Sequence, residues 1–386
     1  MPSSDDVETY LDNRLGGRLG ESTPKTSEEW ETIINTCSYH RATFYFPFVE
    51  VSLMAVPISI VGNFNRPSAN ASLGALAVLP ENILSQVVME LDFKSLRLFR
   101  NTSRSTHEAV TSVPGYKQVM RHSLRAVFSL YRLNLDHVVT LGKVHRALTK
   151  ATCDLCDDFA GFLFLPTATR CCYNCLRTKP ETAIIGRMDV VANCPQRYRN
   201  SLIRAMRDRP PLVFNVQDWL QPGHIRADDQ SALTSDVIDA YSRIADIEAH
   251  PSTIPETGWL EHRSGAAIPL GHFHIPTDTT EHGISCKGCY KVFLGDKTER
   301  ARERSHFPDV PEGCEDRDRS FSKQGFRVHF ESYEGAKELW ARSRNGQNAG
   351  FRSDFVDRGG ISFEEDQMMM YFRQQLEPNL DADAQV

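Results

Sequence analysis

The chain has 386 residues, of which 40% are hydrophobic and 24% charged, a composition ordinary for a soluble protein with two or three modules and a buried core. This excludes a fibrous or wholly disordered chain, and the mild formal net charge of −6 identifies no partner by itself. The first twelve residues carry acidic side chains and no basic apolar pattern, which argues against a secretory or mitochondrial signal and predicts an intracellular protein of the cytoplasm and/or nucleus.

Residues 1–75 show no dependable periodicity, and we interpret them as a partly disordered N-terminal extension. Their single long apolar run, Tyr45 to Gly62, contains one glutamate and two prolines. A bilayer span needs about 20 mainly apolar residues, so this run predicts either a partly buried β-like segment or a poorly ordered one, and no membrane partner.

From Leu79 the pattern becomes helical. Pro80 suits a first helical turn, and apolar residues then recur at helical spacing as far as Leu91. A second short helix is expected near Leu96, and Ser105-x-x-Glu108 predicts the capping box of a third. Because so small a bundle cannot bury its whole apolar stripe, we expect part of the stripe to contact a partner. The candidate partner-binding residues are Leu79, Pro80, Ile83, Leu84, Val87, Val88, Leu91 and Leu96.

Pro114 is expected to end the third helix and to begin a longer one that carries an apolar face. Another short helix is predicted over 140–150. Between Lys94 and Lys150 there are eleven Lys/Arg and two acids, which could meet an acidic partner or nucleic acid. Aromatic residues do not alternate with these basic residues as a base-stacking platform requires, so a solvated helix face is favoured.

Five of the ten cysteines lie in one short window, CDLCDDFAGFLFLPTATRCCYNC. These include two pairs of cysteines, each with two residues between its members. Fifteen residues separate one pair from the other, which is the spacing of a four-thiolate zinc site. The run from Gly161 to Leu165 predicts a strand, and Pro166-Thr167 predicts the turn that returns the second pair to the first. The predicted ligands are Cys153, Cys156, Cys172 and Cys175.

Two alternatives to this zinc site stay open. The four cysteines could be buried free thiols or form two disulfides, although disulfides are disfavoured inside the cell. Cys171-x3-Cys175 would also fit the second pair, so Cys171 competes with Cys172 as a ligand.

A second pair, Cys286 and Cys289, encloses a glycine that permits the tight turn such a pair needs. Its remaining ligands could come from Cys314, His306 or His329. Between the two cysteine regions, residues 235–248 carry a helical apolar stripe. Beyond 346 the composition predicts a linker and an acidic tail, with a possible amphipathic helix at 363–376.

The order Leu79-Pro80-Glu81-x-Ile83-Leu84, Leu91-Asp92, Leu96 and Ser103-Arg104 resembles an F-box. With the GFLFLPT and CC segments downstream, the region from Leu79 to Thr182 resembles a family of fungal F-box proteins. The resemblance implies an adaptor that docks on the Skp adaptor of a cullin–RING ubiquitin ligase and meets an unknown substrate protein. In that family a second cysteine pair precedes a His-x3-Cys, which implies His329 as a ligand, but here Tyr333 replaces the cysteine.

These observations predict an α+β, mainly helical fold: a three-helix F-box, a helical stretch and a four-cysteine zinc knuckle. No P-loop, dinucleotide turn, nucleophile elbow or HExxH helix is present, so we expect a non-catalytic protein with structural zinc. A zinc-stabilised nucleic-acid-binding protein that uses residues 94–150 is the alternative. The predicted modules are 1–75 (extension), 76–113 (F-box), 114–200 (helices and zinc site), 201–285 (connecting region), 286–345 (second cysteine module) and 346–386 (linker and tail).

Overall fold

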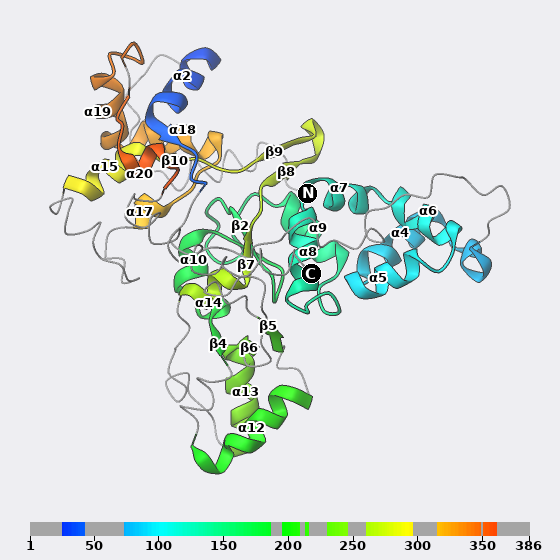
Figure 1. Cartoon of the computed structure of the whole chain (residues 1–386). Coiled ribbons are helices and arrows are strands. Elements are labelled where there is room, and N and C mark those ends of the chain that lie inside the picture. The colour runs from blue at the N-terminus through cyan, green and yellow to red at the C-terminus, as the bar shows by residue number, and fades with distance from the viewer. Residues whose placement is uncertain are drawn as a thin grey trace, which may run out of the picture.

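The structure is a computed structural model that describes residues 25–42, 73–186, 195–208, 213–215, 230–245, 260–295, 315–348 and 350–360. Over these residues the fold is mainly helical, with small antiparallel sheets, and three projections extend from a central region (Figure 1). The apolar run at 45–62, Cys314, His306 and the helix expected at 363–376 lie outside the described residues.

The first projection is the predicted three-helix bundle. The chain enters through a short 3-10 helix and then forms three helices: η2 (Gly74–Val78), α4 (Glu81–Glu90), α5 (Phe93–Arg100) and α6 (Arg104–Ser112). Asp92 caps α5 by accepting a hydrogen bond from the Ser95 amide at 2.8 Å. The capping box of α6 is formed by Ser103 and Thr106, so the predicted box that began at Ser105 was wrong by two residues.

The helix expected after Pro114 is divided in two. Ser123 leaves the helical conformation, with φ −136° and ψ 28°, and separates α7 (Pro114–His122) from α8 (Leu124–Arg132). Its hydroxyl bonds back to the Val119 carbonyl and so helps to end α7. The next helix, α9 (Leu141–Thr149), lies within the predicted range 140–150 and is capped by Thr140.

The bundle and the following helices share one hydrophobic core. Val88, Phe93 and Leu96 are buried together with residues of α7, α8 and α9, and the Tyr131 hydroxyl donates to the Phe93 carbonyl at 2.8 Å. The inner side of the F-box-like bundle is therefore packed on its own chain, which leaves only its outer side for a partner.

The central sheet carries the first cysteine window. Strands β2 (Phe162–Phe164) and β3 (Thr169–Cys171) form the expected hairpin, and β7 (Ala267–Pro269) pairs with β2 from a distant part of the sequence. The hairpin turn places Ala168 at φ 54°, in the left-handed region. Helix α10 (Tyr173–Thr178) follows β3 directly, so both halves of the cysteine window meet at one end of this sheet.

The second projection lies at the bottom of Figure 1. Its sheet has the order β4-β6-β5, and the predicted helix near 235–248 is α13, packed on the unpredicted α12. Between α10 and β7 the chain forms η3 (Pro180–Thr182), β4 (Ile184–Gly186), α12 (Gln196–Asp208), β5 (Val213–Asn215), β6 (Gln230–Leu233), α13 (Thr234–Ala245) and α14 (Leu260–Gly265), of which α14 lies beside α10.

A hairpin leads into the third projection, which combines both ends of the described chain. The N-terminal helix lies beside the C-terminal helices in Figure 1, and its Ile33 and Ile34 are buried with Phe326 and Phe330. The elements are α2 (Ser27–Cys37), β1 (Ser38–Tyr39), β8 (His272–His274), η5 (Ile275–Thr277), β9 (Thr279–Glu281), β10 (Ser285–Cys286), α15 (Lys287–Gly295), α17 (Glu315–Asp318), α18 (Lys323–Ser332), α19 (Glu334–Arg342) and α20 (Asp354–Asp357).

Residues 25–42 are therefore part of a folded module, in contrast to the extension expected for this region. Strand β1 pairs with β10 in the register Ser38↔Cys286, which attaches the N-terminal segment directly to the second cysteine pair. Among the described residues, no helix is both long enough and apolar enough to cross a membrane.

Candidate metal centres and docking face

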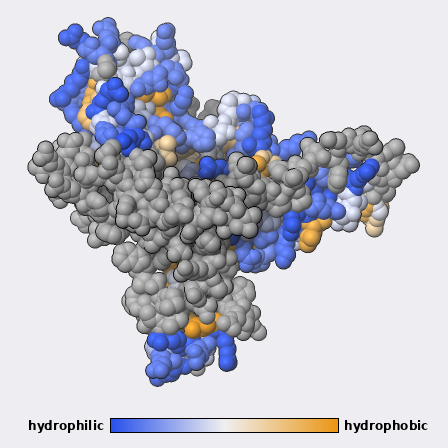
Figure 2. Space-filling view, in the orientation of Figure 1, coloured by the Kyte–Doolittle hydropathy of each residue, from blue (hydrophilic) through white to orange (hydrophobic). Residues whose placement is uncertain are grey.

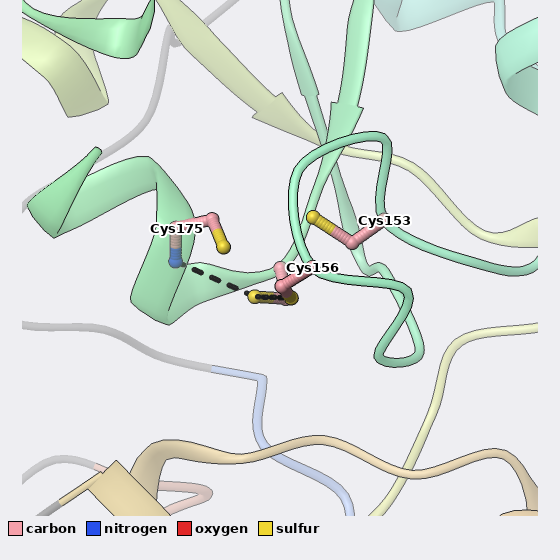
Figure 3. Close-up of side chains that lie close together, drawn as sticks. Cys153, Cys156 and Cys175 are labelled. Carbon is pink, nitrogen blue, oxygen red and sulfur yellow. Dashed lines mark hydrogen bonds between the residues drawn. The ribbon is translucent and has the colours of Figure 1, made fainter. Parts of the chain in front are cut away.

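The first cluster brings four thiols to one point. The Sγ atoms of Cys153, Cys156, Cys172 and Cys175 all lie within 4.8 Å of one another. Figure 3 shows Cys153 and Cys156 on the loop before the sheet and Cys175 on α10, with their sulfurs turned toward a common centre.

The spacing suits a tetrahedral ion better than a disulfide. Cys156 Sγ and Cys172 Sγ are 3.6 Å apart, and all described cysteines are free. With metal–sulfur bonds of about 2.3 Å, tetrahedral geometry places two sulfurs about 3.8 Å apart, whereas a disulfide needs about 2.05 Å. The structure thus disfavours the disulfide alternative and leaves a cluster that could hold a metal ion.

Cys172, and not Cys171, belongs to this cluster. Cys172 is the N-cap of α10, and its sulfur accepts a hydrogen bond from the Cys175 amide at 3.4 Å. Cys171 is the last residue of β3 and is fully buried in the hydrophobic core, outside the group of four. Successive strand residues point to opposite faces of a sheet, which explains why only one of the two adjacent cysteines reaches the cluster.

The pKa values of the thiols in this cluster are shifted in opposite directions. Hydrogen bonding with Cys172 lowers the pKa of the Cys153 thiol to about 5, and the same bond raises the pKa of Cys172. Burial raises the pKa of Cys175 to about 12. A bound divalent ion requires thiolates, so loading this cluster would release protons and would weaken as the pH falls.

The second cluster has three donors. Cys286, Cys289 and His329 place one ligand atom each within 4.8 Å of the others, and Cys289 Sγ lies 3.4 Å from His329 Nε2. A tetrahedral zinc with one sulfur and one nitrogen ligand would separate those atoms by about 3.6 Å. Hydrogen bonding with Cys289 lowers the pKa of Cys286 to about 5.

Close packing positions this second pair. A Cβ atom on Gly288 would lie 2.7 Å from the Ala336 nitrogen and from the Gly335 carbonyl carbon, so only glycine lets the pair approach the start of α19. His329 stacks between Phe321 and Tyr333, with ring centroids 4.4 Å and 4.8 Å away. This aromatic packing orients the histidine of the cluster.

The apolar stripe of α4 is divided between the core and the surface. Leu84, Val88 and Leu96 are buried, at 8%, 0% and 2% exposure, so these three candidates contact the chain itself. Leu91 is half-buried and Pro80 is exposed. We define the docking face as the four exposed apolar side chains Val78 (84%), Leu79 (36%), Ile83 (38%) and Val87 (42%).

The docking face lies on the projection that carries α4 to α6. Figure 2 shows hydrophobic surface on this arm, which Figure 1 draws at the right and away from the other two projections. Val78 had no signal in the helical periodicity because it precedes α4, in η2. Among the described residues, the four side chains of this face are therefore at least partly exposed.

A buried ionic cluster, which the sequence did not reveal, connects the two cysteine regions. The Asp318 carboxylate is 1% exposed and pairs with Arg41, with Arg177 at 3.3 Å and with Arg317 at 2.9 Å. Burial alone would raise the pKa of Asp318, but Arg41 and Arg317 outweigh it and hold the pKa far below its usual range. Arg177 lies on α10, which carries Cys175, and Arg41 follows β1, which pairs with the strand of Cys286. This cluster therefore joins α10 to the strand pair beside the second group of donors.

Comparison with known families gives one result for this chain. The F-box domain model matches residues 76–118, which contain the end of η2, all of α4, α5 and α6, and the first half of α7. No curated protein and no solved structure matches the chain. The family match thus covers the projection with the docking face and leaves both cysteine clusters outside it.

Proposed function

We propose that this protein is a non-catalytic F-box adaptor, whose residues 76–118 dock on the Skp adaptor of a cullin–RING ubiquitin ligase. The remaining modules would then present an unidentified substrate protein to the ligase. One observation carries the proposal: the segment that matches the F-box domain exposes Val78, Leu79, Ile83 and Val87 together on a projecting arm. Exposed apolar groups of this kind mark protein interfaces.

We also propose zinc as the ion of the four-cysteine cluster, in a structural role. Four thiolates complete a tetrahedral shell, and soft sulfur ligands in that geometry favour zinc. The ion would join the loop that carries Cys153 and Cys156 to the start of α10. Apparent binding free energies of such sites are on the order of 10 kcal/mol, which makes zinc a major part of local stability.

The contacts of three of the eleven basic residues between 94 and 150 favour this proposal over nucleic-acid binding. Arg97 and Arg100 lie over the rings of Tyr131 and Tyr116, and Arg100 is buried. Arg121 pairs with Asp278. A basic surface for phosphates needs its charges free and aligned, whereas these three are engaged in separate contacts with the chain itself.

The test is the affinity of the full-length protein for a purified Skp adaptor. A double change of Ile83 and Val87 to Ala should weaken binding roughly ten- to a thousandfold, since truncating an interface anchor costs about 1–3 kcal/mol. Both side chains are exposed, so thermal stability and metal content should stay unchanged. Leu84 is unsuitable as a probe because it is buried, and its truncation would also disturb the fold.

Val292→Ala is the matched control, because Val292 is an apolar residue of α15, 49% exposed, on a different projection. It should leave adaptor affinity unchanged. Equal affinity of the Ile83/Val87 double variant and the wild type, or no binding of the wild type at micromolar concentration, would contradict the adaptor proposal.

A further inference from the structure

A lysine side chain occupies an aromatic corner between α2 and α18. The rings of Trp30 and Phe330 have centroids 5.9 Å apart and planes at 84°, so they form two walls at nearly a right angle. The Lys25 Nζ atom lies over both rings, 4.9 Å from the centroid of Trp30 and 5.7 Å from that of Phe330. The Glu331 carboxylate forms an ion pair with the same ammonium group. We call Trp30, Phe330 and Glu331 the ammonium corner.

The three members of the ammonium corner share a preference for a positive group with apolar surroundings. The face of an aromatic ring attracts a cation within about 6 Å of its centroid, and tryptophan attracts it most strongly. Phe330 is 2% exposed and supplies a desolvated wall, whereas Trp30 and Glu331 are half-buried and remain accessible. Arg327 also places its guanidinium 5.5 Å from the Trp30 centroid, which is a second sign that this ring attracts cations.

Lys25 can leave the corner without unfolding α2. It precedes Thr26, the N-cap of that helix, and the capping box between Thr26 and Glu29 does not involve the Lys25 side chain. The side chains of Lys25 and Glu331 are 22% and 28% exposed, so water screens their contact. Ion pairs and cation–π contacts at partly exposed sites are weak, which makes the position of Lys25 exchangeable.

We propose that the ammonium corner binds a lysine side chain of a partner protein, preferably in its methylated form, and that Lys25 fills it as an internal ligand. Methylation keeps the positive charge of lysine and adds apolar surface, which suits two aromatic walls better than a bare ammonium group. The corner lies on the third projection, whereas the docking face lies on the first. The inference is therefore independent of adaptor docking and of the metal assignments.

The indole N–H resonances of the full-length protein, labelled isotopically at tryptophan, test this proposal. The chain has four tryptophans, and the Trp30 resonance is the one that Trp30→Phe removes. The probe is a short peptide with one trimethyllysine. In Lys25→Met this peptide should shift the Trp30 resonance with an apparent dissociation constant at least about tenfold lower than in the wild type, because a tethered competitor has been removed. Lys25→Gln, which also lacks the charge, should behave in the same way.

Lys323→Met is the matched control. Lys323 also joins α18 to α2 through an ion pair, with Glu31 at 3.3 Å, but it is 57% exposed. Its replacement leaves Lys25 in the corner, so the peptide should bind as weakly as it does to the wild type. Two further probes identify what the corner recognises: the same peptide with norleucine lacks the ammonium group, and tetramethylammonium chloride lacks the peptide. Both should bind Lys25→Met more weakly than the trimethyllysine peptide does.

Three results would overturn the proposal. If millimolar trimethyllysine peptide left the Trp30 resonance unmoved in both Lys25 variants, the corner would accept no external ligand. Equal apparent dissociation constants in the wild type and Lys25→Met would mean that Lys25 does not compete for the corner. If the norleucine peptide or tetramethylammonium bound as tightly as the trimethyllysine peptide, the corner would recognise an apolar chain or a free amine and not a lysine side chain.

Discussion

Replacing Asp318 by asparagine should loosen the contact between the two cysteine regions. The substitution preserves the shape of the side chain and removes the negative charge that pairs with Arg41, Arg177 and Arg317. The three guanidinium groups would keep their buried positions, with side-chain exposures of 1%, 10% and 6%. Loss of one partner from a buried ion pair typically costs about 3–5 kcal/mol, because the remaining charge is left uncompensated.

That magnitude is a large share of the stability of a typical domain, about 5–15 kcal/mol. The effect should be concentrated where Arg41 joins β1 to the ionic cluster. Three to five kcal/mol corresponds to a roughly hundred- to several thousandfold increase in local opening, which amide hydrogen exchange measures directly. We therefore expect amides that pair β1 with β10 to lose protection by that factor.

Asp316→Asn is the matched control, because Asp316 lies on the same short helix but is exposed. Substitutions at exposed sites usually change stability by no more than about 0.5 kcal/mol, so protection should stay within a few fold of the wild type. If Asp318→Asn changed protection by less than tenfold, or by no more than Asp316→Asn, the assignment of a joining role to this cluster would be refuted.

Three further predictions concern acid, a glycine and a buried arginine. The folded-state pKa of Asp318 is depressed, so its contribution to the free energy of unfolding is fully present above the unfolded pKa of about 3.8 and is lost progressively as the pH falls below that value. Acid titration followed by circular dichroism should therefore show less acid sensitivity below about pH 4 in Asp318→Asn than in the wild type. Gly288→Ala should displace α19 and reduce metal binding at the second cluster only, which elemental analysis would measure as a lower metal content. Gly161→Ala is the control, because the space around its Cβ position is open, and it should keep the full metal content. Arg170 donates hydrogen bonds to the carbonyls of Ala147, Ala160 and Gly271. Arg170→Met should therefore lower the free energy of unfolding, measured by denaturant titration, by about 3 kcal/mol. A loss under about 1 kcal/mol would contradict the stabilising role given to these bonds.

Local patterns in the sequence predicted much of the F-box-like bundle and of the first cluster. The periodicity of α4 and the spacing of Cys153, Cys156, Cys172 and Cys175 depend only on nearby residues, and the family match and the thiol geometry agree with them. The choice between Cys171 and Cys172 could not be made, because it depends on which face of β3 points to the loop.

The sequence patterns did not predict contacts between segments that lie far apart in the chain. Nothing near Arg41 indicates a carboxylate at Asp318, and β7 joins β2 across about a hundred residues. Periodicity also identified Leu84 and Ile83 as one apolar stripe without revealing that Leu84 faces the core and Ile83 the surface. Such distinctions arise from tertiary packing, which a helical repeat does not encode.

The pairing of β1 with β10 also sets an order of events during synthesis. Its two strands are separated by about 250 residues, so at a translation rate of about 5–20 residues per second the first strand waits roughly 12–50 s for the second to leave the ribosome. During that interval Ile33, Ile34 and Cys37 lack the partners that bury them in the finished protein. Chaperone binding to the nascent chain should therefore begin at residues 25–42 and end only after α18 and α19 have emerged.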